Sequence, residues 1–99
     1  MAMFLVTHRR TGAEWDPSRP LEEQSRWLEH ASFMDGLVDA GFVVLGGPLA
    51  DDQRVLLAVE ADSEDDVRAT LKSDPWSGTH LQEDSIERWT IRLDARAIP

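Results

Sequence analysis

Two short segments of this chain are apolar at every consecutive position, and this pattern restricts the fold more than any other. Residues 43–45 read Val-Val-Leu, and residues 55–59 read Val-Leu-Leu-Ala-Val. Because the side chains of a strand alternate between the two faces of a sheet, strands of this kind carry apolar groups on both faces. The sequence therefore predicts a sheet that is covered on both sides.

The first half of the chain predicts a strand, a helix and a second strand. A β-forming run at 3–8 precedes a loop rich in Gly and Pro. Apolar positions then recur with the spacing of one helical face, which predicts a helix over 21–40 that ends at Gly41. The next strand, at 42–45, is expected to end in a turn made by residues 46–48, which read Gly-Gly-Pro.

The second half predicts two more strands around a shorter helix. A strand at 54–60 is followed by Ser63 and three acidic residues, which are typical of a helix start. Asp74 and Pro75 end this helix near residue 73, because the residue before a proline is pushed out of the helical conformation. Residues 86–93 alternate between apolar and polar and predict the last strand.

The order β-α-β-β-α-β indicates an α+β fold of the ferredoxin-like type, a four-stranded antiparallel sheet with both helices on one face. Ninety-nine residues make a single domain, 1–99, with a core of about 3–93. Two helices cover one face only, and soluble monomers rarely expose a large apolar patch. We therefore expect a homodimer in which a second copy covers the other face. The alternative is a sheet that curls and is covered by its own loops.

The composition excludes several classes of partner and site. Nineteen acidic and ten basic residues give a formal charge of −9, which argues against nucleic acid and against an anionic membrane surface. No stretch approaches the ~20 apolar residues of a membrane span. The chain has no Cys, and His8 and His80 lack metal-ligand spacing, so we expect no metal. A cytoplasmic protein that needs no cofactor is expected.

Two residues are the main candidates for chemistry. His30 lies on the shoulder of the apolar stripe of the predicted helix, beside Trp27 and Met34. A histidine at the rim of a cavity suits general acid or base catalysis, although an exposed histidine at the helix edge fits the same spacing. Asp74 is held by Pro75 and could orient an imidazole, or it could only begin a short helical turn.

Three further features could serve a ligand or only the fold. Trp76 could form the wall of an apolar pocket or belong to the core. Gly47 and Pro48 could allow a ligand to approach closely, or they could only turn the chain. Arg9 and Arg10 could receive an anionic substrate, although two exposed arginines fit the sequence equally well.

Taken together, some of these residues resemble the YCII-related (YciI-like) family of small bacterial proteins. The resemblance spans roughly residues 3–93 and is carried by the order and spacing of His30, Gly41, Gly47-Pro48 and Asp74-Pro75-Trp76. It implies a dimeric α+β barrel in which His30 and Asp74 form the active-site pair. This chain has Trp27 and Ala31 where the family often has Arg and Leu.

The resemblance implies a small-molecule-binding protein, and known members and related barrels include a dehydrochlorinase and lactone isomerases. The expected activity is that of a cofactor-independent lyase or isomerase in which His30 moves a proton on a small cyclic or aromatic substrate. Asp74 is expected to fix the tautomer of His30. The expected substrate-binding residues are Trp76, Gly47, Pro48, Trp27 and Met34. The alternative is a non-catalytic dimeric module that binds a ligand or acts as a scaffold.

Overall fold

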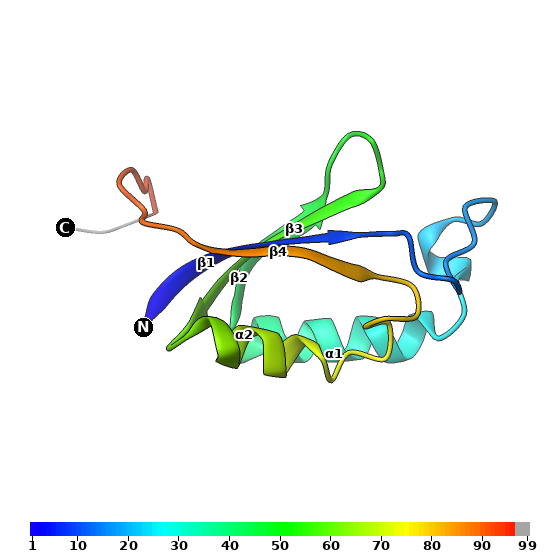
Figure 1. Ribbon diagram of the computed structural model, residues 1–99, viewed down its shortest axis with the longest axis horizontal. Helices are drawn as coiled ribbons and strands as arrows, with labels where there is room; N and C mark the ends of the chain where they lie inside the picture. The colour runs from blue at the N-terminus through cyan, green and yellow to red at the C-terminus, as the bar shows by residue number, and fades with distance from the viewer. Residues whose placement is uncertain (97–99) are drawn as a thin grey trace.

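The computed structural model describes residues 1–96; the last three residues of the predicted domain, 97–99, lie outside the described residues. Its elements are β1 (Ala2–Arg9), the 3-10 helix η1 (Leu21–Glu23), α1 (Trp27–Asp39), β2 (Val43–Pro48), β3 (Arg54–Ala61), α2 (Glu64–Leu71) and β4 (Gln82–Arg88). The four strands form one antiparallel sheet in the order β2-β3-β1-β4, and both helices lie on the same side of it (Figure 1). The predicted ferredoxin-like α+β fold is confirmed.

The core lies between the sheet and the two helices. The central strand β1 buries Phe4 and Val6 there, while α2 contributes Val67 and Leu71. Val6 and Val67 are completely buried, and each such side chain stabilises the fold by about 1.5–3 kcal/mol. The same alternation along β1 places His8 on the helix side of the sheet, which brings it to the candidate site.

The predicted helix over 21–40 is interrupted. Residues 21–23 form the separate 3-10 helix η1, and α1 starts only at Trp27, because Arg26 has φ of 60°, in the left-handed region. The buried side chain of Gln24 explains the break, since it serves the preceding loop. Its amide nitrogen donates to the carbonyl oxygens of Asp16 and Arg19, at 2.6 and 3.0 Å, and its oxygen accepts from the backbone N–H of Asp16.

Two predicted helix signals are confirmed, Gly41 at the end of α1 and Ser63 at the start of α2. Gly41 has φ of 77°, and the N–H groups of Gly41 and Phe42 donate to the carbonyls of Val38 and Leu37, the paired bonds of a Schellman motif. At the start of α2, the hydroxyl of Ser63 accepts a bond of 3.1 Å from the N–H of Asp66.

The predicted turn at residues 46–48 is wrong, because these residues belong to β2. Gly47 pairs with Leu56 and Pro48 with Val55, after a register shift near Val44. A Cβ at position 46 would lie 2.6 Å from a methyl carbon of Leu57, so the Leu57 side chain would have to shift to admit one. The chain turns later, at 49–53, where the N–H of Asp52 donates to Leu49.

The predicted last strand also has different bounds. β4 covers 82–88, because those residues are the ones that reach the eight-residue partner β1. The N–H of Trp89 still donates to the carbonyl of Met3, but residues 91–93 lie beyond the end of β1. Leu93 consequently has an exposed fraction of 94%.

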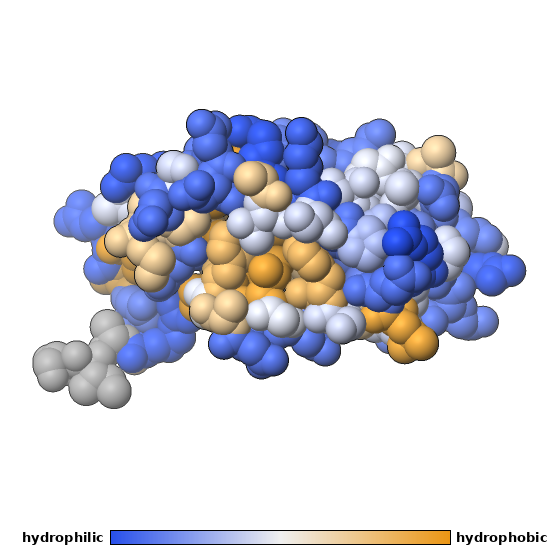
Figure 2. All heavy atoms as spheres, turned by 90° about the horizontal axis from the view of Figure 1, so that it is seen from below, coloured by the Kyte–Doolittle hydropathy of each residue, from blue (hydrophilic) through white to orange (hydrophobic). Residues whose placement is uncertain are grey.

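Apolar side chains reach the surface on both sides of the sheet. On the helix side, apolar side chains form a band across the middle of the surface, flanked by polar side chains (Figure 2). On the opposite side, Leu45 and Trp89 have exposed fractions of 60% and 44%. They line a shallow hollow together with Leu5, Gly46, Gly47, Pro48, Leu56 and Ala58. The loops of the described chain leave this outer face open.

No helix within residues 1–96 has the length and apolar character that crossing a membrane requires.

Candidate active site

The structure brings His30 and Asp74 into direct contact. His30 lies in the first turns of α1, and its Nδ1 is 2.9 Å from each oxygen of the Asp74 carboxylate. Both side chains are largely buried, with exposed fractions of 12% and 4%. Two residues that are 44 positions apart in the sequence thus form a hydrogen-bonded pair.

Asp74 is held in place by the turn that follows α2. Its N–H donates to the carbonyl of Leu71, and its Oδ1 accepts a bond of 2.9 Å from the backbone N–H of Trp76. Both interpretations of Asp74 from the sequence therefore apply, because one carboxylate starts the turn and contacts the imidazole.

The pairing determines which nitrogen of His30 is free. An ionised carboxylate can only accept hydrogen bonds, so Nδ1 of His30 carries the proton that is donated to Asp74. Nε2 then keeps its lone pair, and no described residue hydrogen-bonds to it. A neutral His30 in this tautomer can accept a proton from a ligand at Nε2.

Trp76 fixes the plane of the imidazole of His30. The two rings are stacked, with centroids 4.0 Å apart and an interplanar angle of 5°. The indole is 1% exposed, and its Nε1–H donates to the carbonyl of Ser25 at 2.9 Å. Trp27 and Trp15 pack against Trp76 with centroid distances of 5.8 Å each. Trp76 is thus both a core residue and the surface against which His30 is held.

His80 supports the opposite face of Trp76, a role that the sequence analysis missed. Its ring lies 4.6 Å from the indole at 15°, and the residue has no exposed surface. Trp76 and His80 are four residues apart in a turn, with the N–H of His80 donating to the carbonyl of Trp76. The spacing of four residues between Trp76 and His80 could have indicated this contact, because residues four apart in a helical turn lie on the same side.

The hydrogen bonds of His80 favour a neutral ring. The hydroxyl of Thr79 donates to the carbonyl of Pro75, so it accepts from Nδ1 of His80 at 3.0 Å. Nε2 of His80 then accepts from the hydroxyl of Ser25 at 2.9 Å. Burial lowers the pKa of His80 from its ordinary value, since the charged ring would lose its hydration.

A small pocket of about 120 Å³ lies beside this stack, between the sheet and α1. Five of the predicted site residues line it together: His30, Asp74, Trp76, Trp27 and Met34. Gly47 and Pro48 do not reach this pocket. They line the hollow on the outer face, because they are strand residues of β2 and do not form the expected turn.

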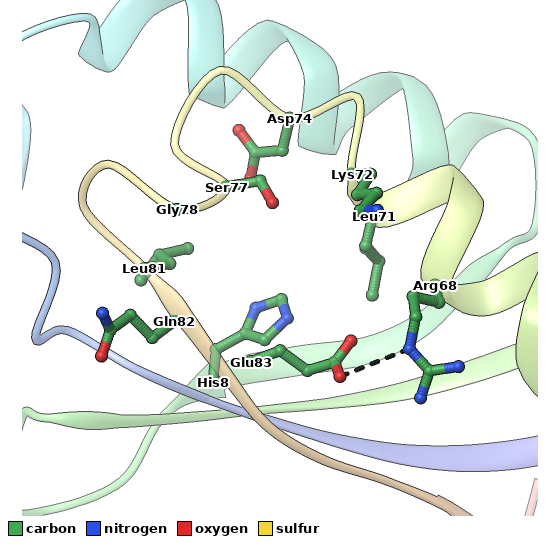
Figure 3. Close-up of a pocket in the computed structure, with 10 residues that line it drawn as sticks. All are labelled: His8, Arg68, Leu71, Lys72, Asp74, Ser77, Gly78, Leu81, Gln82 and Glu83. Carbon is green, nitrogen blue, oxygen red and sulfur yellow. Dashed lines mark hydrogen bonds and ion pairs between the residues drawn. The ribbon is translucent and has the colours of Figure 1, made fainter.

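A second, more open pocket of about 450 Å³ lies between the end of α2 and β4. Figure 3 shows the imidazole of His8 pointing from the sheet into it, with Asp74 and Ser77 on the other side. Glu83 lines the same pocket and forms an ion pair of 3.5 Å with Arg68. The two pockets share His8, Asp74 and Leu81.

His8 was considered in the sequence only as a metal ligand, although the alternation of β1 places it on the same face as Phe4 and Val6. Burial lowers the pKa of His8, with the carboxylates of Glu83 and Asp74 opposing that shift. Within residues 1–96, no three His, Asp or Glu side chains gather closely enough to hold a metal ion.

Of the two alternatives for Arg9 and Arg10, that of two exposed arginines is wrong for Arg10. Arg9 is half-exposed and pairs with Asp84 at 3.2 Å. Arg10 is only 8% exposed and lines the small pocket with His30. Its Nη1 donates to the carboxylate of Asp52 at 2.6 Å and to the carbonyl of the same residue at 3.1 Å.

No protein-family model, no curated protein and no solved structure matches this chain. The fold and the site define a ferredoxin-like α+β protein with a largely buried His-Asp pair at the edge of a small, mostly apolar pocket.

Proposed function

We propose that the protein binds a small cyclic or aromatic compound next to His30 and acts on it as a cofactor-independent lyase or isomerase. The observation that carries this proposal is the His30–Asp74 pair on the wall of the pocket of about 120 Å³. The residue pattern that resembles the YCII-related family supports the same assignment, since it implies an active-site role for these two residues.

The proposed chemistry begins with His30 as a general base. Nε2 removes a proton from an acidic C–H or O–H group of the substrate, and the Asp74 carboxylate stabilises the imidazolium that forms. Return of the proton to another atom gives isomerisation, whereas departure of a leaving group from the resulting anion gives elimination. A positioned base of this kind contributes roughly 10²–10⁴ in rate, which is sufficient for a substrate that is already acidic.

The test compares the chain with its His30→Gln variant on a panel of butenolide lactones and chlorinated hydroxyquinols, with product formation followed by chromatography. We expect turnover of at least one compound by the unchanged chain, and a rate about 10²–10⁴ lower for the variant. Urea unfolding of both proteins serves as the control for folding. Binding of a panel compound without turnover, or equal rates for the two proteins, contradicts the enzymatic proposal and favours the non-catalytic module.

We also propose that the protein is a homodimer joined through the outer face of the sheet. Support comes from the apolar side chains that this face leaves in water, such as Leu45, and from the two-sided apolar pattern of β3. A second copy presents the same apolar face, so a twofold arrangement covers both at once.

Sedimentation tests the dimer. The unchanged chain is expected at twice its 11.2 kDa at micromolar concentration, and Leu45→Asp is expected to shift it to the monomer. Leu28→Asp is the matched control, because Leu28 is 80% exposed on α1, on the opposite side of the molecule. A monomeric unchanged chain, or equal dissociation by both variants, contradicts the outer-face dimer.

A further inference from the structure

We propose that Arg10 binds the ligand of the His30–Asp74 pocket and that this ligand carries a carboxylate on a body the size of a single ring. The inference rests on the proposed function, because it places the ligand in the same pocket. It adds a binding residue and a class of compound.

The argument starts from an incomplete set of hydrogen bonds. Both contacts of Arg10 with Asp52 use Nη1, whereas Nε is buried and has no acceptor among the described residues. A buried N–H of a charged group without a partner costs folding free energy. A guanidinium presents Nε–H and one Nη2–H as a fork that matches the two oxygens of a carboxylate. The Nε edge of Arg10, which is the one that carboxylates prefer, therefore has no acceptor among the described residues.

The position of Arg10 is constrained by its neighbours. Its guanidinium carbon lies 4.9 Å from the centre of the Trp15 ring, and its ion-pair partner Asp52 is on the solvent side, with a side chain that is 78% exposed. The chain as a whole has a net charge of −9, which repels anions at long range. A local cation at the pocket is therefore required if an anion is to bind there.

The pocket sets the size and character of the rest of the ligand. Its volume of about 120 Å³ is close to the ~150 Å³ of a cavity that holds benzene. Trp27, Met34 and Trp76 supply apolar walls, and Arg10 and His30 are on the same lining. A ligand whose ring contacts the indoles and whose carboxylate contacts Arg10 therefore matches both the apolar and the charged part of the lining.

The test uses benzoate and benzamide, which share a ring and differ in charge, as probes for the full chain labelled with 15N. Binding is followed by the NMR signals of the indole N–H groups. We expect benzoate to bind about ten- to hundredfold more tightly than benzamide, and Arg10→Gln to remove that preference. Benzamide binding is expected to change little in the variant.

Two matched variants separate contact from charge. Arg9→Gln makes the same change in net charge at the neighbouring position, where the side chain pairs with Asp84, and it is expected to keep the preference. Asp52→Asn removes the ionic partner of Arg10 and is expected to keep it as well. If Arg10→Gln does not fold, Arg10→Lys keeps the charge but lacks the fork, and it is expected to lose most of the preference.

Three results overturn the inference: equal affinity of the unchanged chain for the two probes, no binding of benzoate at millimolar concentration, or equal losses in Arg9→Gln and Arg10→Gln. These results differ from a failure of the proposed function. Lactone or hydroxyquinol turnover that depends on His30, without a benzoate preference, removes only the role of Arg10. A benzoate preference in a protein that turns over no panel compound removes only the enzymatic proposal.

Discussion

Replacing Trp76 with alanine is expected to lower the free energy of unfolding by about 3–5 kcal/mol, the cost of removing a buried aromatic ring and leaving a cavity. Trp76 is 1% exposed and is stacked between His30 and His80. Domains of this size have only about 5–15 kcal/mol in total, so much of the stability is lost. Urea unfolding followed by far-UV circular dichroism measures the change.

Trp76→Phe is the control for this prediction, because it keeps an aromatic ring in the stack but loses the Nε1–H that donates to Ser25. Its loss is expected to be clearly smaller than that of Trp76→Ala. A loss below about 1 kcal/mol for the alanine variant contradicts the view that this stack is part of the core.

Replacing Asp74 with alanine is expected to lower the free energy of unfolding by about 2–5 kcal/mol. The change leaves Nδ1–H of His30 and the backbone N–H of Trp76 without their shared acceptor in a buried place. Asp74→Asn keeps an acceptor oxygen, so it is expected to lower the free energy of unfolding by less than Asp74→Ala does. Chemical unfolding at neutral pH gives both values.

The matched control is Asp84→Ala, because Asp84 is also an aspartate that contacts a basic side chain. Its ion pair with Arg9 is exposed, however, with side-chain exposed fractions of 46% for Arg9 and 43% for Asp84. Exposed pairs of this kind contribute about 0–1 kcal/mol. Similar losses for Asp74→Ala and Asp84→Ala are the outcome that contradicts a special role for Asp74.

The fold could be predicted because its signals are local. The continuous apolar runs, the glycine at position 41 and the Ser63 cap each depend on a few neighbouring residues, and each is confirmed. The alternating run at 86–93 overlaps β4 only at 86–88. The break before α1 could not be predicted, because it depends on Gln24 reaching back to a loop. The place of Gly46 in β2 likewise depends on its pairing with Leu57, a residue of the neighbouring strand.

The site could be predicted only in part for the same reason. His30 and Asp74 were identified from helix position, from proline and from the family resemblance, but their contact joins two distant segments. The burial of Arg10 could not be predicted, because nothing nearby in the sequence indicates that Asp52 and Trp15 contact it. The stacking of His80 on Trp76 depends on the geometry of the turn that joins them. The spacing of the two residues suggests this contact, whereas the composition does not.

The four tryptophans of the chain divide into two groups with different surroundings. Trp15 and Trp27 both pack against Trp76, and Trp27 and Trp76 line the small pocket, whereas Trp89 lies on the outer face of the sheet. Their ultraviolet emission therefore has two sources, one inside the stack of rings and one at an open surface. In a chain with Trp89→Phe, the remaining fluorescence comes from these three packed rings, two of which line the pocket, so its intensity is expected to change when a compound enters the pocket.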